Sequence, residues 1–350
     1  MKMKLKKNEL LIFLVVIALM FMMVETIYSA NLENKLVVRT EADATLASML
    51  EKSFEQNYPG VDAVVITMGS SDSFVKSFME FPNVQADILT TKKYYFIKGI
   101  KDSMKKFGEV MFMPYKSPMR VNQIPDLVDK DGYYQVERWA ARAIICNEDA
   151  AKKFGVPKGL NDLLTWKGKF DYADPIQYGS GFSFLQTVIQ DIGGYENPMP
   201  GIEYMKKLYK AHDIKNAATS VLTQMLETGE IDAMWNFDIF LYRLREKGLS
   251  VEAIYPEEGT VISCNCVGIL ANCQHPNAAK AWIDFVLSEN TQKMITEQTY
   301  YRTPGKNVKL PQEMSKYIIP NADKINFNIP DELIAEKTNE WKRLFEDNIF

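Results

Sequence analysis

The side chains best suited to hold a ligand stand at the predicted start of a helix. Tyr178-Gly179-Ser180-Gly181 precedes an apolar stretch with helical spacing over residues 182–192. N–H groups in the first turn of a helix have no partner within the helix, and the macrodipole adds partial positive charge. Gly179 and Gly181 permit close backbone approach, and the two hydroxyls can donate hydrogen bonds. This loop therefore predicts a site for phosphate or carboxylate oxygens.

Two further predicted helices begin with serine. Ser220 occupies a predicted N-cap position before the helix at 221–227, and Ser70-Ser71 stands before the helix that follows the second strand. Three such starts around one cleft would hold an oxyanion without a large formal charge. The alternative for each serine is that its hydroxyl only caps its own helix.

Arg142 lies in the long extended segment 134–147. A guanidinium group there could bind a phosphate or carboxylate with two parallel hydrogen bonds, and Arg138 falls on the same face by the two-residue repeat of a strand. The alternative role for Arg142 is a structural salt bridge with Glu137 or another acid.

Carboxylate and amide side chains form a second group of candidates, because they accept hydrogen bonds from the hydroxyl or amino groups of a ligand. They occur in WNFD (235–238), in YPEEG (255–259) and after the first predicted strand. The candidates are Asn236, Asp238, Glu257 and Glu41, with the neighbouring Glu258 assigned to a solvated surface.

The elements that must position these residues alternate between strand and helix. Residues 35–39 and 61–67 have the pattern of strands, residues 44–57 carry Leu46, Leu50 and Phe54 at helical spacing, and 86–89 form a third strand. This alternation predicts an α/β fold with a parallel sheet. Ligands of such sheets bind beyond the carboxyl ends of the strands, which is where the candidate loops lie.

Two long extended segments, 134–147 and 261–270, bracket a middle α/β block. We expect them to be hinge strands between two lobes. The first lobe would comprise residues 31–137 and 265–350, with the last helices packing back on it, and the second lobe residues 138–264.

The 350 residues include 41 Lys and Arg against 45 Asp and Glu, a net charge of −4. This balance provides no basic field for nucleic acid. The sequence has no HExxH, no GxSxG, no Walker loop and no GxGxxG after a strand, and only two histidines. We therefore predict a binding protein without a cofactor rather than an enzyme.

Export is predicted by the N-terminus. Four lysines at positions 2, 4, 6 and 7 precede the apolar run Leu10–Val24. This pattern is typical of a signal peptide over residues 1–30, or of an anchor if it is not cleaved.

The four cysteines are Cys146, Cys264, Cys266 and Cys273. In an oxidising compartment a Cys266–Cys273 disulfide is conceivable, but free buried thiols are the preferred interpretation for all four.

Five segments resemble the periplasmic substrate-binding proteins of ABC importers, in the branch that holds binders of ferric ion, sugar phosphates and related anions. GYYQVERWAARAIICNEDAAKKFG (132–155) is similar to GYW…V…VYNTDLLKK, and DPIQYGSGFSF (174–184) to DPxxSGTxxTF. SVLTQMLETGEIDAMWNFD (220–238) is similar to SxxPARLVAQGEYAIGIGFD, VEAIYPEEGT (251–260) to VEVVYPEEGT, and HPNAAKAWIDFVLSENTQKMI (275–295) to NPENAKKFIDFLLSPEGQELL.

The resemblance implies a type II periplasmic-binding-protein fold with two lobes, each a mainly parallel sheet flanked by helices, that are joined by hinge strands and close on a ligand. It also implies a periplasmic location, delivery to an ABC permease with its ATPase, and a monomer. A ferric-ion binder is the alternative, although the segment WNFDIFLY lacks the tyrosine pair of that group; the sequence FDIF also departs from the FDHD of sugar-phosphate binders. A sensor subunit for a membrane receptor would use the same fold.

Overall fold

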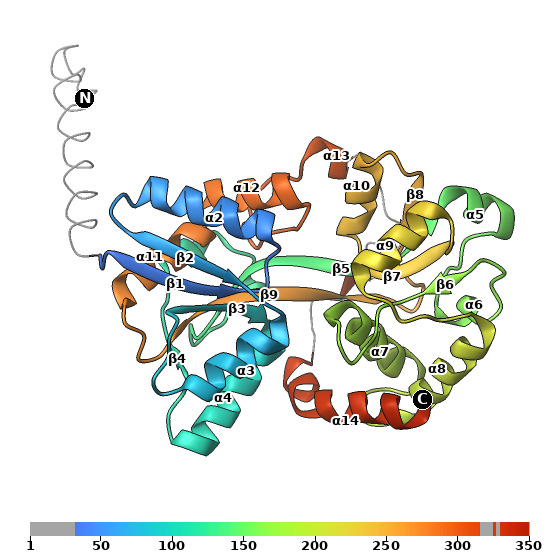
Figure 1. Ribbon diagram of the computed structural model, residues 1–350, viewed down its shortest axis with the longest axis horizontal. Coiled ribbons are helices and arrows are strands. Elements are labelled where there is room, and N and C mark those ends of the chain that lie inside the picture. Colours follow the sequence, from blue (N-terminus) through green and yellow to red (C-terminus); the bar gives the residue numbers. More distant parts are fainter. Residues whose placement is uncertain (1–31, 316–324, 327–329, 350) are drawn as a thin grey trace, which may run out of the picture.

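The computed structural model describes residues 32–315, 325–326 and 330–349. They form two α/β lobes, and the long strands β5 and β9 run through both of them (Figure 1). The signal peptide predicted over residues 1–30 lies outside the described residues. Among the described residues, no helix has the length and apolar character needed to span a bilayer.

The first lobe is built on β1, β2 and β3, which pair in parallel, and β9 runs antiparallel to β3. Its elements are β1 (Lys35–Thr40), α2 (Ala44–Asn57), β2 (Asp62–Thr67), α3 (Ser70–Glu80), β3 (Ile88–Lys92), α4 (Lys93–Phe107), β4 (Phe112–Met113), the 3-10 helices η1 (Pro118–Asn122) and η2 (Pro125–Leu127), β9 (Thr260–Leu270), α11 (Pro276–Leu287) and α12 (Glu289–Thr299).

The second lobe has a mixed sheet rather than a mainly parallel one. β5 pairs antiparallel with both β7 and β8, while β6 and β7 are parallel. Its elements are β5 (Gln135–Asn147), α5 (Glu148–Phe154), α6 (Leu160–Leu163), β6 (Phe170–Asp171), α7 (Gly179–Ile192), α8 (Met199–Ala211), α9 (Thr219–Thr228), β7 (Ala233–Phe237), α10 (Ile239–Glu246) and β8 (Val251–Ile254), followed late in the chain by α13 (Gln312–Ser315), β10 (Ile325–Asn326) and α14 (Asp331–Ile349).

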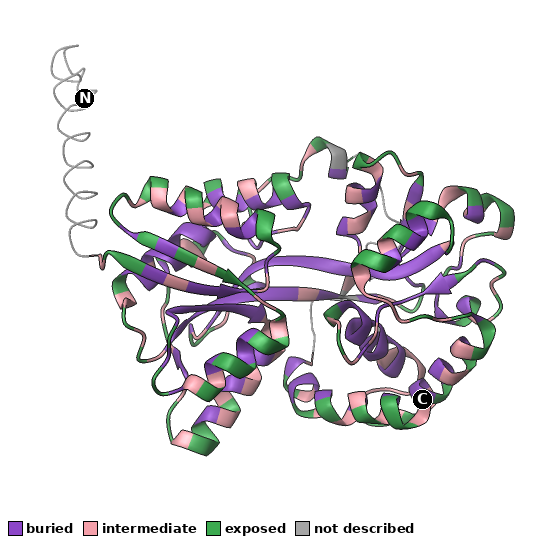
Figure 2. Cartoon of the chain, viewed as in Figure 1, coloured by how far each residue is buried: buried purple, intermediate pink, exposed green. Residues whose placement is uncertain are grey.

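Each lobe buries its own apolar layer between sheet and helices. In the first lobe, α2 places Leu46, Leu50 and Phe54 against Trp282 of α11, which confirms the helical spacing of these three residues. In the second, Trp235 of β7 packs with aromatic residues of α7. Figure 2 shows β5 and β9 buried along most of their length, because helices cover both faces of these strands.

The C-terminal helix α14 is placed differently from the prediction. Its apolar residues Ile334, Trp341 and Phe345 belong to the core of the second lobe, and Trp341 stacks on Tyr195 with 5.4 Å between ring centroids. The helix also contacts α4 of the first lobe. The expectation that it packs back on the first lobe is therefore met only in part: α14 contacts α4 of the first lobe but buries its apolar residues in the second.

All four cysteines are free thiols, and Cys146, Cys264 and Cys266 are buried. Burial raises the pKa of Cys146 and of Cys264 to about 12, so both thiols are protonated at neutral pH. This agrees with the structural role preferred from the sequence.

Candidate ligand-binding site

Two helix starts of the second lobe lie side by side. Helix α7 follows Tyr178, helix α9 follows Ala218, and neither has a side-chain cap. The hydroxyls of Ser180 and Thr219 join them through a hydrogen bond of 2.8 Å. Two positive helix ends, each with uncapped first-turn N–H groups, are thereby brought together.

The three candidate serines do not cap their own helices. Ser220 is the second residue of α9 and not its N-cap, because the N-cap is Ala218, two positions earlier than predicted. Ser180 is likewise the second residue of α7, and Ser70 is the first residue of α3, after Gly69. Since α3, α7 and α9 all lack side-chain caps, the capping alternative is wrong for these serines.

The two glycines of the α7 start have different surroundings. A Cβ atom at Gly181 would overlap the carbonyl group of Ala173, whereas a Cβ atom at Gly179 would meet nothing within 4 Å. The sequence predicted a close approach between the glycine backbone and a ligand. In the structure, Gly181 instead makes its close approach to the backbone of residues 173–174. Gly179 is exposed and leaves space in front of the helix start.

This difference predicts opposite outcomes for two matched substitutions. Gly181→Ala should lower the free energy of unfolding by about 1–3 kcal/mol, because the added methyl group forces α7 away from the 173–174 backbone. Gly179→Ala should change the free energy of unfolding by less than about 0.5 kcal/mol. Chemical denaturation of both variants tests this; equal losses would show that the α7 start is packed differently.

The first lobe contributes a carboxylate and an ammonium group. Ser70 donates a hydrogen bond to Glu41, whose side chain is only 5 % exposed and which pairs with Lys92 at 3.3 Å. Lys92 also donates to Oδ1 of Asn265 on β9 at 2.9 Å, and the Thr91 hydroxyl donates to the carbonyl of Ser70. Ser71 is exposed in the next position of α3.

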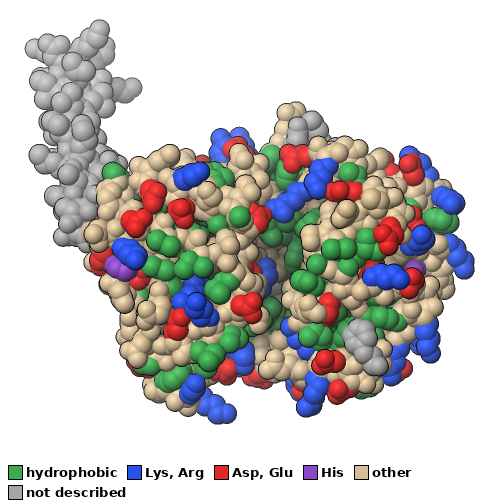
Figure 3. Space-filling model, in the orientation of Figure 1, with side chains coloured by type: hydrophobic (Ala, Val, Ile, Leu, Met, Phe, Trp, Pro, Cys, Tyr) green, Lys and Arg blue, Asp and Glu red, His purple; other side chains and the backbone are tan. Residues whose placement is uncertain are grey.

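These groups face the second lobe. The Lys92 ammonium lies 5.7 Å from the ring centroid of Phe237, the last residue of β7. Phe237 and Tyr178 both pack against the apolar cluster that includes Ala173, Leu222 and Met234, and β7 is in contact with α7. Figure 3 shows the molecule hollowed between the two lobes, with apolar and basic side chains along the hollow.

Arg142 does not reach these helix starts. Arg142 is 4 % exposed, and its guanidinium donates to the Ser183 carbonyl and the Thr187 hydroxyl at 3.1 Å each, and to Oε1 of Gln186 at 2.6 Å. All three partners lie one to two turns inside α7. The predicted salt bridge with Glu137 is also absent here, since Glu137 pairs with Arg138. In this structure Arg142 therefore holds α7 on β5.

The remaining candidates are separated as well. Asp238 is fully buried and accepts hydrogen bonds from Arg302 at 2.6 Å and from Tyr255 at 2.5 Å, so its charge is used inside the protein. Asn236 is buried beside it and accepts from the N–H of Phe237. Glu257 is exposed, in a loop whose backbone bonds to Lys158 near α6.

Sequence reasoning missed three members of the site: Lys92, Thr219 and Asn265. Lys92 ends β3, and the rule that ligands bind beyond the carboxyl ends of strands points to that position. Thr219 precedes the candidate Ser220. The bond between Lys92 and Asn265 joins residues 173 positions apart, and no local pattern indicates it.

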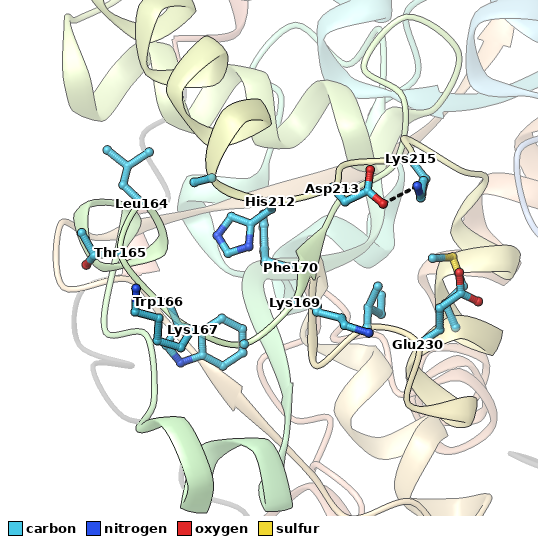
Figure 4. Close-up of a pocket in the computed structure, with 14 residues that line it drawn as sticks. Leu164, Thr165, Trp166, Lys167, Lys169, Phe170, His212, Asp213, Lys215 and Glu230 are labelled. Atoms are coloured by element: carbon cyan, nitrogen blue, oxygen red, sulfur yellow. Dashed lines mark hydrogen bonds and ion pairs between the residues drawn. The ribbon is translucent and has the colours of Figure 1, made fainter.

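A cavity of about 590 Å³ lies elsewhere in the second lobe (Figure 4). Glu230, just past α9, and Ala211, at the end of α8, line it, so it sits at the opposite end of α9 from Thr219. Lys215 there is paired with Asp213 at 2.5 Å. This cavity is separate from the hollow between the lobes.

Adjacent tyrosines, the kind of pair that could bind iron, occur at 94–95, 133–134 and 300–301, and each pair takes part in aromatic packing. Tyr95 stacks on Phe74 with 5.0 Å between centroids, and Tyr300 stacks on Tyr242 at 5.3 Å. Burial raises the pKa of Tyr134 and keeps its phenol protonated. Across the described residues, no group of three or more His, Cys, Asp and Glu side chains is placed to hold a metal ion.

Known proteins resemble this chain in sequence or in fold. An uncharacterized protein of Haemophilus influenzae is 26% identical over 286 residues, which are 77% of this chain and 78% of that protein. The periplasmic binding protein AfuA from Actinobacillus pleuropneumoniae, solved with fructose-6-phosphate, superposes with a TM-score of 0.71 at 23% identity, covering 90% of this chain and 98% of AfuA. Iron-bound HitA from Pseudomonas aeruginosa superposes with a TM-score of 0.74 at 19% identity, covering 89% and 99%.

The two solved structures confirm the two-lobed periplasmic-binding-protein fold, while the ligands in them differ. The model of one protein family matches residues 85–328, which is more than half of the chain and includes most of both lobes. The chain therefore belongs to the bacterial extracellular solute-binding proteins.

Proposed function

We propose that this protein captures a small phosphorylated or otherwise anionic metabolite between its lobes and delivers it to an ABC importer. The observation that carries the proposal is the pair of uncapped helix starts joined by the Ser180–Thr219 hydrogen bond. The first-turn N–H groups of two helices converge there, and a phosphate or carboxylate can accept several of them at once. The exposed Ser220 adds a third hydroxyl to this start.

The residues of the first lobe favour a ligand that has a hydrogen-bond donor in addition to its anionic group. Glu41 is a buried carboxylate bonded to Ser70 and Lys92. A hydroxyl or amino group of the ligand can donate to Glu41, while Lys92 is placed to pair with the anionic group. The anionic group would then contact both lobes and the donor group of the ligand would contact Glu41, so that binding would favour the closed arrangement.

Delivery requires that the lobes move. We propose β5 and β9 as the hinge, with lobe boundaries near residues 137 and 265, because these antiparallel strands are the main connection between the lobes. In this proposal the protein is a periplasmic monomer that presents the closed form to a permease with its ATPase, and the predicted leader exports it. It performs no catalysis on its cargo.

Substitution of the hydroxyl that joins the helix starts tests the site. Thr219→Val should weaken the binding of a phosphorylated ligand by roughly tenfold or more, because hydrogen bonds to charged groups contribute about 1.5–3 kcal/mol. Thr228→Val, at the far end of the same helix, should leave binding unchanged. The ligand is first found by thermal shift against sugar phosphates, phosphonates, phosphoglycerates, thiamine, polyamines and ferric citrate, and affinities are then measured by calorimetry.

Other results of the screen would contradict the proposal. Stabilisation by Fe(III) alone, with a visible phenolate-to-metal absorption band, would identify an iron binder. An anionic ligand whose affinity is the same in Thr219→Val and in the parent protein would place the anion site elsewhere. A ligand bound as proposed, but by a protein that interacts with a membrane receptor and not with a permease, would identify a sensor.

A further inference from the structure

A second, smaller cavity of about 20 Å³ lies between the lobes, away from the paired helix starts. The first turn of α4, the strands β5 and β9, the middle of α7 and the first turn of α14 meet around it. A cavity of this size has room for one water molecule or one monatomic ion. Its lining residues are Lys92, Lys93, Tyr94, Arg142, Gln186, Ile262, Ser263, Cys264, Asp331 and Ile334.

The lining carries an excess of positive charge. Lys92, Lys93 and Arg142 are cationic, and Asp331 is the single acid among the lining residues. Lys93 pairs with Asp331 at 2.8 Å, and Lys92 pairs with Glu41. Arg142 is left without a carboxylate partner, since its three hydrogen bonds go to a carbonyl, a hydroxyl and an amide oxygen.

A buried guanidinium without a counter-charge destabilises the folded protein, because the charge has lost its contact with water. Burial accordingly lowers the pKa of Arg142. Asp191 is a further acid whose charge acts on Arg142. However, burial and then the charge of Glu258 raise the pKa of Asp191 to about 7, so this carboxyl is only partly ionised at neutral pH. The protein groups around Arg142 therefore leave its charge incompletely balanced.

Two lining side chains also have N–H donors that lack a partner. Nε of Arg142 and Nε2 of Gln186 are buried without a hydrogen bond, and both side chains are more than nine-tenths buried. The Gln186 amide cannot turn over to satisfy its nitrogen, because its Oε1 accepts the 2.6 Å bond from Arg142. These two donors border the same cavity as the incompletely balanced charge of Arg142.

We propose that this cavity binds a single monatomic anion of the halide class, chloride in a biological setting, as the counter-ion of Arg142. The anion accepts hydrogen bonds from Gln186 and Arg142 and lies near the ammonium groups of Lys92 and Lys93. It thereby links α7 of the second lobe to α4 of the first. Water would satisfy the donors but not the charge. The site shares Lys92 with the proposed metabolite site, but its donors Gln186 and Arg142 lie away from the paired helix starts, and no metabolite is needed to test it.

The substitution Gln186→Glu supplies the missing negative charge from the protein. Its carboxylate keeps an oxygen for Arg142 and removes the amide donor. We expect the parent protein to gain at least about 2 °C in unfolding midpoint when chloride at about 0.1 M replaces gluconate at equal ionic strength, because gluconate is too large for the cavity. Gln186→Glu should be more stable than the parent in gluconate and should show no response to chloride.

The control is Gln190→Glu, one turn further along α7, which should keep the full chloride response because Gln190 does not line the cavity. Crystals grown with bromide provide an independent observation that does not depend on any variant. An anomalous peak between Arg142 and Gln186 is expected. Equal stability of the parent protein in chloride and gluconate, a chloride response that survives in Gln186→Glu, or a water at this position with no anomalous signal would overturn the proposal.

Discussion

Asp238→Ala should lower the free energy of unfolding by about 3–5 kcal/mol, because it removes a fully buried carboxylate and leaves the largely buried Arg302 without its partner. Burial alone would lower the pKa of the Arg302 guanidinium, but the charge of Asp238 outweighs that effect and raises it. The same carboxylate accepts hydrogen bonds from Tyr255 and from the N–H of Ala141. One side chain thus joins β5 and the β8–β9 loop to the segment after α12.

Two companion variants separate charge from shape. Asp238→Asn keeps the size and an acceptor for Tyr255 but loses the charge, so its loss should be smaller. Asp238→Ala combined with Arg302→Met should recover part of the stability, since the unpaired guanidinium is removed as well. A loss below about 1 kcal/mol for Asp238→Ala in chemical denaturation would show that this carboxylate is available for a ligand, as the sequence first suggested.

Trp341→Ala should cost about 3–5 kcal/mol, because Trp341 is fully buried in the core of the second lobe and stacks on Tyr195. A surface substitution on the same helix, Lys337→Ala, removes only an exposed ion pair with Glu340 and should change stability by less than about 0.5 kcal/mol. Near-equal values for the two variants would mean that α14 is not part of the core.

The sequence predicted those elements whose pattern is local. The spacing of Leu46, Leu50 and Phe54 was sufficient to place α2, and the glycines and hydroxyls at 178–181 were sufficient to mark a helix start. The predicted start of α9 lay two positions too late, because Thr219 and Ser220 have favourable N-cap side chains and Ala218 does not, so only the backbone shows that Ala218 is the N-cap.

The packing of these elements against one another was harder to predict from the sequence. The two-residue repeat of β5 gives the face on which Arg142 lies but not which helix covers that face, so its burial under α7 was missed. The amphipathic pattern of α14 requires an apolar partner without naming the lobe. Asp238 could accept hydrogen bonds from a ligand, but in the structure its carboxylate forms an ion pair with Arg302, which is far away in the sequence.

A crystal structure of the protein with the tightest-binding compound from the ligand screen tests the central claim most directly. The proposal predicts a phosphate or carboxylate group within hydrogen-bond distance of first-turn N–H groups at residues 179–181 and 219–221, with a hydroxyl or amino group of the ligand at Glu41. A ligand whose anionic group lies away from both helix starts, or an Fe(III) ion held by tyrosine side chains, would contradict it.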